Sequence, residues 1–410
     1  MKKAGWIWVL IWLYTPVLWS TSIEVGPNSA FKRIKQAIEQ ASAGDTIWIN
    51  KAVYRENNII ITKPLTIIGR DHPVIDGEYK GQIIQFKTDS FTIDGLLIRN
   101  VGQSYTVDYA GVHISKSKKF IIRNMILENV FFGMLIEKSK NGLIENNLVS
   151  SQAYDEVKSG NGIHLWHCEN IIIRKNELSR LRDGIYFEFV KNSEIYENFS
   201  HDNVRYGLHF MFSNSDNYHD NVFVNNGSGV AVMFSKHIQM RRNTFAQNWG
   251  MASYGLLLKE IYDAEIINNT FLKNTIGINI EGCTRIHYAH NDFKNNGWAL
   301  KIAGACYKNV FEKNNFLFNA FDLSYNGQLN NNSFNQNYWS SYTGYDLDKN
   351  GTGDVPYRPV KLFSYIVNQT PETIILLRSL FVDIINFSEK VTPVFTPDNL
   401  IDKQPAMNPL

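Results

Sequence analysis

The chain is poor in cysteine, in basic clusters and in long hydrophobic runs. Its three cysteines, Cys168, Cys283 and Cys306, are too few and too scattered among 410 residues for a disulfide framework. It has no basic stripe of the kind that binds nucleic acid, and no Walker A sequence for ATP. Beyond the N-terminus, no apolar segment reaches the roughly 20 residues of a membrane span. These absences argue against a disulfide-rich domain, a nucleic-acid-binding protein and an ATPase.

The N-terminus has the layout of a secretory signal peptide. Lys2 and Lys3 precede an apolar run, and Ser20 and Ser22 place small residues before a cleavage site at Ile23. We therefore expect residues 1–22 to be removed and the mature chain to be exported. An uncleaved membrane anchor is the alternative. Without Lys2 and Lys3, the mature chain has 39 basic and 39 acidic residues and is formally neutral.

A glycine followed by alternating apolar residues recurs through the middle of the chain, with spacings of 22, 29, 22, 23, 22, 26 and 22 residues. The glycines are Gly111, Gly133, Gly162, Gly184, Gly207, Gly229, Gly255 and Gly277, and two further turns begin at Ala299 and Ala320. A fixed period of about 22 residues indicates a solenoid, and the alternation within each turn indicates strands. The sequence therefore predicts an all-β fold, a right-handed parallel β-helix.

An asparagine follows each glycine by 13 to 14 residues, at Asn124, Asn146, Asn176, Asn198, Asn221, Asn243, Asn269 and Asn291. In a coil these amides stack, and each bonds to the amide of the next turn. We give the glycines and asparagines a structural role and no chemistry.

Five segments are expected along the chain. They are a signal peptide (1–22), an N-terminal cap with the first turn (23–65), the β-helix (66–340), a loop with an Asp/Gly-rich turn (341–370), and a C-terminal amphipathic helix with a tail (371–410). The cap contains an amphipathic helix over 30–41. The two long repeat spacings predict loops over 152–160 and 247–254, which either carry function or are ordinary length variation.

Several long blocks, in order along the chain, resemble the NosD family. They are Gly162-Ile-His-Leu-Trp, Arg182-Asp-Gly-Ile-Tyr-Phe-Glu-Phe, Arg205-Tyr-Gly-Leu-His-Phe-Met-Phe-Ser, Gly229-Val-Ala-Val-Met-Phe-Ser, Tyr254-Gly-Leu-Leu-Leu-Lys-Glu-Ile and Gly353-Asp-Val-Pro-Tyr-Arg-Pro. The resemblance implies a non-enzymatic periplasmic factor that helps an ABC transporter deliver copper to apo nitrous-oxide reductase. It implies transporter ATPase and membrane subunits and a copper-chaperone lipoprotein as partners. The helix from Pro371 then docks on the membrane subunit, caps the last turn, or does both.

The repeat also brings potential copper ligands together. The second and fourth residues after each glycine are expected to face outward. His209 and Met211 then share one face, and Met233 stacks on Met211 from the next turn. Thioether and imidazole groups suit Cu(I), so we hypothesise a transient Cu(I) contact. The alternative is a face for protein recognition, with His164, Trp166, Tyr186 and Glu188 as partner-binding residues.

Two weaker candidates are Cys168 and an acidic loop. Cys168 falls in a column of small residues, which favours packing over metal binding. The acidic loop resembles part of a calcium-binding loop and carries Asp346, Asp348, Asn350 and Asp354. It ends on Tyr357 where an EF-hand has a glutamate, and turn formation explains it almost as well.

A β-helix that binds or cleaves polysaccharide is the rival function. Glycoside hydrolysis needs two carboxylates across one sugar bond. Glu188 and Glu281 share an outward column, but four turns separate them. The aromatic residues Trp166 and Tyr186 keep a non-catalytic sugar-binding module open as an alternative, because the fold does not decide function.

Overall fold

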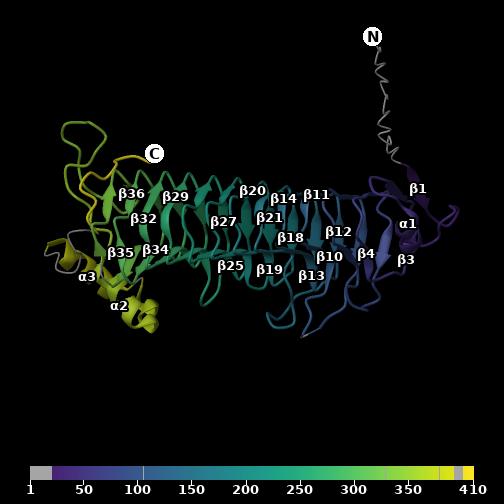
Figure 1. Cartoon of the computed structure of the whole chain (residues 1–410). Helices are drawn as coiled ribbons and strands as arrows, with labels where there is room; N and C mark the ends of the chain where they lie inside the picture. Colours follow the sequence, from purple (N-terminus) through teal and green to yellow (C-terminus); the bar gives the residue numbers. More distant parts are fainter. Residues whose placement is uncertain (1–20, 105, 328, 378, 392–399) are drawn as a thin grey trace, which may run out of the picture.

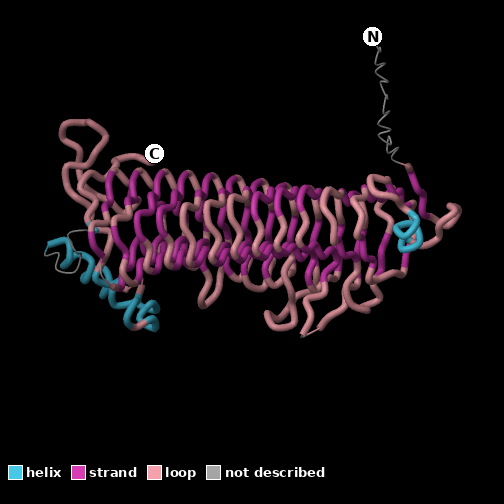
Figure 2. Tube along the Cα trace, in the orientation of Figure 1, coloured by secondary structure: helices cyan, strands magenta, loops and turns pink. Residues whose placement is uncertain are grey.

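The computed structural model describes residues 21–104, 106–327, 329–377, 379–391 and 400–410 of the chain. The described residues form one elongated coil of parallel strands, which runs from β1 at one end to the C-terminal helices at the other (Figure 1). Its three sheets lie along the length of the coil (Figure 2). The predicted parallel β-helix is confirmed.

The first sheet has sixteen strands: β1 (Ser22–Val25), β2 (Thr46–Ile49), β5 (Thr66–Gly69), β8 (Thr92–Asp94), β11 (Lys118–Arg123), β14 (Lys140–Glu145), β17 (Glu169–Arg174), β20 (Glu194–Tyr196), β23 (Asn217–His219), β26 (Gln239–Arg241), β29 (Tyr262–Ile267), β32 (Thr284–Ala289), β35 (Cys306–Tyr307), β36 (Val310–Glu312), β39 (Leu329–Asn330) and β40 (Ser333–Asn335). The second sheet has twelve: β4 (Ile59–Ile61), β7 (Ile84–Phe86), β10 (Ala110–Ser115), β13 (Phe132–Glu137), β16 (Ile163–Trp166), β19 (Asp183–Glu188), β22 (Tyr206–Met211), β25 (Ser228–Met233), β28 (Tyr254–Lys259), β31 (Ile276–Glu281), β34 (Trp298–Ala303) and β38 (Phe321–Asn326). The third has thirteen: β3 (Val53–Tyr54), β6 (Val74–Asp76), β9 (Leu97–Arg99), β12 (Ile126–Glu128), β15 (Leu148–Ser150), β18 (Glu177–Ser179), β21 (Phe199–His201), β24 (Val222–Val224), β27 (Thr244–Ala246), β30 (Thr270–Leu272), β33 (Asp292–Lys294), β37 (Asn315–Leu317) and β41 (Tyr338–Trp339).

The repeat glycines are needed because neighbouring turns approach closely there. A Cβ atom on Gly184 would lie 2.2 Å from the Ser200 hydroxyl oxygen and 2.6 Å from the carbonyl oxygen of Gly207. The glycine therefore makes room for the next turn, and this close approach explains why glycine recurs at this position. One predicted turn start is wrong: Leu300 pairs with Leu323, so Asp322 stands opposite Ala299, two residues beyond the predicted Ala320.

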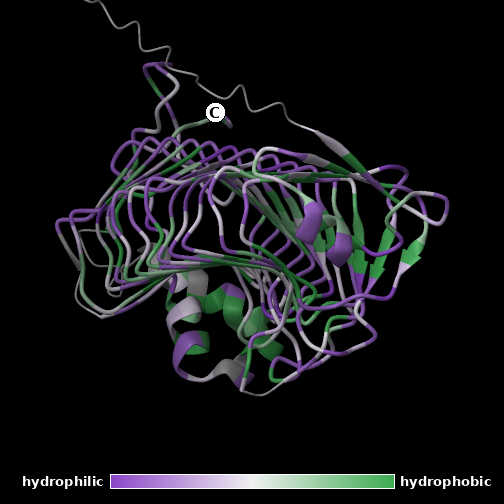
Figure 3. Cartoon of the chain, turned by 45° about the vertical axis from the view of Figure 1, so that its right-hand side comes forward, coloured by the Kyte–Doolittle hydropathy of each residue, from purple (hydrophilic) through white to green (hydrophobic). Residues whose placement is uncertain are grey.

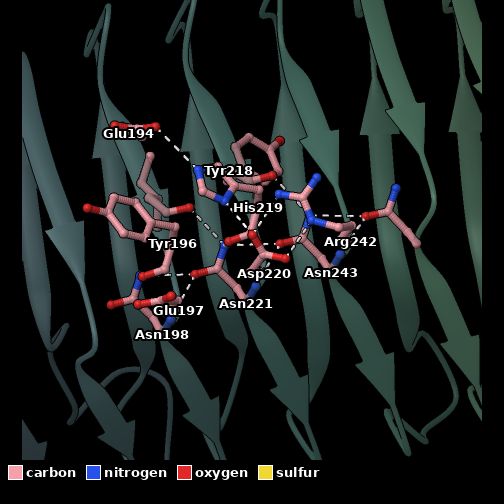
Figure 4. A network of polar contacts seen from close by, with 12 residues as sticks. Glu194, Tyr196, Glu197, Asn198, Tyr218, His219, Asp220, Asn221, Arg242 and Asn243 are labelled. Atoms are coloured by element: carbon pink, nitrogen blue, oxygen red, sulfur yellow. Dashed lines mark hydrogen bonds and ion pairs between the residues drawn. The ribbon is translucent and has the colours of Figure 1, made fainter.

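A buried asparagine ladder runs along the coil, as predicted. Each side-chain amide donates to the side-chain oxygen one turn later at 2.8–3.1 Å, and Figure 4 shows three members, Asn198, Asn221 and Asn243. The full ladder is Asn147, Asn176, Asn198, Asn221, Asn243, Asn269, Asn291, Asn314 and Asn337. The prediction was wrong by one residue at its start. Asn146 is exposed, and Met125 rather than Asn124 occupies the ladder position.

The N-terminal end of the coil is covered by helix α1 (Ile34–Gln40), which is shorter than the predicted 30–41 and buries Ile34, Ala37 and Ile38. Most of the predicted signal peptide, residues 1–20, lies outside the described residues. Strand β1 begins at Ser22, the last residue of the predicted signal peptide, and pairs with β2. Among the described residues, no helix combines the length and the apolar character that a bilayer crossing requires.

The C-terminal helices lie on a side of the coil and not over its end. They are α2 (Leu362–Gln369), the 3₁₀ helix η1 (Pro371–Leu376) and α3 (Leu380–Val391). The prediction of one helix from Pro371 was therefore wrong, as was a loop over all of 341–370. Phe363, Val367 and Val382 pack on the outer face of the twelve-stranded sheet, against Ile276, Trp298 and Phe321. Figure 3 shows these helices below the coil.

The tail after the helices closes the last turn instead. Asp402 is fully buried, and one of its carboxylate oxygens accepts bonds from the Asn337 side-chain amide at 3.0 Å and the Trp339 indole at 3.1 Å. The carboxylate thereby occupies the place of the next asparagine in the ladder.

Candidate functional site

The candidate site lies on the outer face of the twelve-stranded sheet. His164, Tyr186 and His209 occupy one column on β16, β19 and β22, in register. Their ring centroids are 4.6 Å apart for His164 and Tyr186, and 5.0 Å for Tyr186 and His209. The predicted column therefore exists on the outside of the coil.

This column is less exposed than the alternation predicted. His209 is only 5% exposed, and its ring lies 4.8 Å from that of Tyr206 as well as beside Tyr186. Other members of the column are also buried, namely Leu135, Ala231, Leu257 and Asn279. Alternation determined which side of the sheet these residues occupy, but neighbouring side chains cover them.

The fully buried Asp183 and the half-buried Arg205 form an ion pair beside His209. The Arg205 Nε donates to Asp183 Oδ1 at 2.8 Å, and a second guanidinium nitrogen contacts Oδ2. Burial alone would raise the pKa of the Asp183 carboxyl, but the hydrogen bonds and charge of Arg205 outweigh it and hold the pKa below its usual value. The carboxylate therefore remains charged, and its Oδ2 lies 3.8 Å from the Nδ1 of His209.

The His209 ring is buried without a hydrogen bond. Among the described residues, neither Nδ1 nor Nε2 has a hydrogen-bond partner, since the 3.8 Å separation from Asp183 is longer than a hydrogen bond. A buried polar group left unpaired is unfavourable by roughly 1–3 kcal/mol. The imidazole therefore has unused hydrogen-bonding capacity, with a carboxylate beside one of its nitrogens.

Two methionines continue the same face. Met211 follows His209 by two residues on β22, and it pairs in register with Met233 on β25. The Tyr186 hydroxyl donates to the Met211 sulfur at 3.6 Å. Both methionines are half-buried. The predicted grouping of His209, Met211 and Met233 on one face of two adjacent turns agrees with the structure.

The residues predicted to bind a partner lie on the two preceding strands of the same sheet, β16 and β19. The His164 pKa is lowered to about 4, by burial and then by the Arg182 charge, so its ring is neutral near pH 7. Burial raises the Tyr186 pKa to about 12, so its hydroxyl stays protonated. The Lys138 ammonium lies 4.7 Å from the centre of the Trp166 ring. Glu188 is half-buried and pairs in register with Met211.

The acidic loop is held by its own backbone. Asp346 accepts bonds from the amides of Asn350 and Gly351, and Asp354 accepts one from the amide of Leu347. In the part of the chain that the structure describes, no three histidine, cysteine or carboxylate groups come close enough together to hold a metal ion. Turn formation accounts for the residues Asp346, Asp348, Asn350 and Asp354, and calcium stays a prediction from the sequence alone.

Cys168 is buried in the core, as expected for a packing residue. It is 1% exposed, and burial raises its thiol pKa to about 12, so the thiolate that binds metals is disfavoured.

Glu188 and Glu281 are too far apart to form a hydrolytic pair. Glu188 and Glu281 occupy the same column on β19 and β31, separated by Met211, Met233 and Lys259. Four strand spacings amount to roughly 19 Å, whereas an inverting pair needs about 6.5–9.5 Å.

Sequence reasoning missed the link between Asp183, Arg205 and His209. The signal was present, because charged residues stand just before the repeat glycine in two consecutive turns: Arg182-Asp183 directly before Gly184, and Arg205 two residues before Gly207. The geometry that joins them depends on side-chain conformations, which the repeat does not specify.

The architecture defines the class as parallel β-helix proteins. The catalytic unit of an α-1,3-glucanase from Streptomyces thermodiastaticus matches with a TM-score of 0.58 and 13% identity, over 78% of this chain and 69% of that one. At this identity the likeness shows the fold alone.

Within that class, the resemblance to the NosD family is confirmed. A family model described as "Periplasmic copper-binding protein (NosD)" matches residues 149–344, which contain the whole candidate site. A Pseudomonas aeruginosa protein named "Probable ABC transporter binding protein NosD" is 24% identical over 393 residues, covering 89% of each chain. A Stutzerimonas stutzeri protein of the same name is 22% identical over 392 residues, covering 89% of this chain and 87% of that one. These matches support a periplasmic role of the NosD kind.

Proposed function

We propose that the protein works in the periplasm with an ABC transporter and helps to deliver copper to nitrous-oxide reductase. It receives copper from a copper-chaperone lipoprotein, holds it transiently, and is not itself an enzyme. The family description supports periplasmic copper binding, and the names of the relatives support association with a transporter. The observation that carries the proposal is the buried, unpartnered His209 ring beside two stacked methionines.

The chemistry of this group suits a cargo ion that must be released. Imidazole and thioether donors are soft or intermediate ligands that bind Cu(I). His209 supplies a ring nitrogen, and Met211 and Met233 supply two sulfurs from neighbouring strands. Asp183 lies beside the other ring nitrogen, the position from which a carboxylate orients a metal-binding histidine. A set without thiolates releases Cu(I) more readily than a cysteine site.

The C-terminal helices are the proposed contact with the transporter. Their outward side is strongly apolar: Ile375 is 87% exposed, Leu380 74% and Phe387 68%. Apolar side chains gathered on an exposed surface mark interaction sites. The inward side is already occupied by the coil, so the exposed side is available to a membrane subunit.

Anaerobic Cu(I) titration against a chromogenic chelator tests the copper site. Replacing both Met211 and Met233 by leucine keeps the side-chain volume and removes both sulfurs, so Cu(I) affinity is expected to fall at least tenfold. Met251→Leu is the matched control, because Met251 lies fully exposed in the loop between β27 and β28. Unchanged affinity, and unchanged copper transfer to the apo reductase, in the double variant would refute the proposal.

A further inference from the structure

A column of stacked aromatic rings lies on the corner of the coil next to the methionines. We call it the corner column, and it consists of His167, Phe189, Phe212 and Phe234. These residues directly follow Trp166, Glu188, Met211 and Met233 along the chain. Successive ring centroids are 4.6, 5.3 and 5.1 Å apart, with interplanar angles of 12°, 11° and 14°.

The column is exposed and occupies an unfavourable backbone position. Phe189 is 41% exposed and Phe212 39%. All four members have positive φ, between 52° and 56°, a region that bulky residues normally avoid. The same corner carries Lys116 and Lys138 on earlier turns and Glu260 on a later one. Phenylalanine on three consecutive turns is therefore a local departure from the polar residues found elsewhere on this corner.

The stacking determines what the column can bind. Each inner ring has both faces covered by its neighbours, so the column presents ring edges to solvent. A sugar stacks on an open ring face, which the two inner rings, Phe189 and Phe212, do not offer. Thioether and aliphatic groups pack well against ring edges. The column therefore fits an apolar protein surface that includes methionine.

The charged residues around the column indicate which charge the rim of the partner's apolar surface carries. Lys138 stands one turn before His167, and Lys191 and Lys236 each follow a ring of the column by two residues. Lys191 also lies 3.9 Å from Glu169, whereas no ion pair is found for Lys138 and Lys236 among the described residues. All three lysines are exposed. An apolar surface with an acidic rim complements this arrangement.

We propose that the corner column is the docking surface for the protein that supplies Cu(I), recognised through an exposed, methionine-bearing copper site with an acidic rim. The inference rests on the proposed function, since Met211 and Met233 directly precede two of the rings. A donor seated on the rings thereby places its copper next to the sulfurs that accept it.

The test replaces Phe189, Phe212 and Phe234 together by asparagine. Asparagine tolerates positive φ, so the variant is expected to fold and to melt no lower than the wild type. The matched control is Phe318→Asn, because Phe318 also has positive φ, 54°, and is 75% exposed on another turn. The probe is the purified Cu(I)-loaded copper-chaperone lipoprotein, with binding measured anaerobically at two salt concentrations.

We expect the triple variant to bind the probe at least tenfold more weakly, the control to bind like the wild type, and wild-type binding to weaken with salt. Equal binding by the triple variant and the wild type, or a Phe-dependent loss of binding to polygalacturonate instead, overturns the docking proposal. The Met211→Leu, Met233→Leu double variant separates the two proposals. If it docks the probe normally and still takes up copper, the copper site is wrong while the docking surface stands.

Discussion

The carboxylate of Asp183 lies 3.8 Å from the Nδ1 of His209 and also forms an ion pair with Arg205. A charged carboxylate beside a histidine favours the ring orientation and basicity that metal binding uses. Asp183 and His209 come from neighbouring turns, and the carboxylate would orient the histidine of the candidate copper site.

Replacing Asp183 by asparagine is expected to lower Cu(I) affinity about 10- to 100-fold. The change removes the negative charge beside His209 and also leaves Arg205 without its ion pair, so some loss of stability is expected. Chelator competition under anaerobic conditions measures the affinity, and thermal unfolding measures the stability. Asp220→Asn is the control, because Asp220 also pairs with an arginine, Arg242, and contacts a histidine, His219, but directly after β23 of the sixteen-stranded sheet (Figure 4). Equal affinity losses in both variants would argue against a specific role for Asp183.

Asp216 makes stability depend on pH. Burial raises the pKa of its carboxyl to about 8, from 3.8. Between these values the unfolded chain loses the proton while the folded chain keeps it, so stability falls as pH rises from about 4 to 8, by about 1.4 kcal/mol per unit of pKa shift at most. In Asp216→Asn this fall should be absent, and the variant should be the more stable protein at pH 9. Unfolding curves at pH 5, 7 and 9 measure it; parallel pH dependence in the two proteins would contradict the assignment.

The asparagine ladder should be sensitive to a single gap. The side-chain oxygen of Asn221 accepts both the backbone and side-chain N–H groups of Asn198, and its amide donates to Asn243. Asn221→Ala leaves the buried backbone N–H of Asn198 unpaired, at roughly 1–3 kcal/mol, and takes one further hydrogen bond each from the Asn198 amide and the Asn243 oxygen. We therefore expect a loss of about 3–5 kcal/mol in urea unfolding. Gln239→Ala, which truncates an exposed amide, should cost under about 0.5 kcal/mol. Comparable losses of unfolding free energy in the two variants would mean that the buried ladder stabilises the fold no more than an exposed amide does.

Substitutions in the C-terminal region should show two separate roles: the tail at Asp402 closes the last turn, and the exposed side of the helices binds the transporter. Asp402→Ala removes the carboxylate that ends the ladder, so melting temperature should fall while transporter binding is kept. The Leu380→Ser, Phe387→Ser double variant should keep its melting temperature and lose transporter binding, because both side chains are exposed. Copurification with the transporter subunits and thermal melting distinguish these outcomes. Loss of transporter binding in the Asp402 variant alone would reassign the contact to the tail.

The repeat in the sequence was sufficient to predict the coil, because strand register follows from a period that the glycines mark. The same period predicted which residues share the outer face of the twelve-stranded sheet. His209, Met211 and Met233 were therefore placed on the same face of two adjacent strands, as the register shows. The errors occurred where a turn departs by one or two residues from the average, as at Asn146 and Ala320. A period alone does not distinguish adjacent residues when both are asparagine, as Asn146 and Asn147 are.

Exposure was predicted less well than orientation. Alternation places His209 outside the coil, but Tyr186 and Tyr206 cover it. The C-terminal helices were detected by their apolar residues, yet the sequence did not indicate that they pack beside the coil. Long-range packing of this kind depends on which outer faces are apolar, and here Trp298 and Phe321 supply that face.

The coil also sets a fixed distance, along its axis, between the candidate copper site and the C-terminal helices. The strand that carries His209 and the strand that carries Trp298, where the C-terminal helices rest, are four strand steps apart, about 19 Å along the axis. Duplicating one whole repeat between them would lengthen this separation by about 4.8 Å while leaving both surfaces on the same side of the coil. The distance between a metal-handling surface and a membrane partner is thus a property that the number of repeats can adjust in discrete increments.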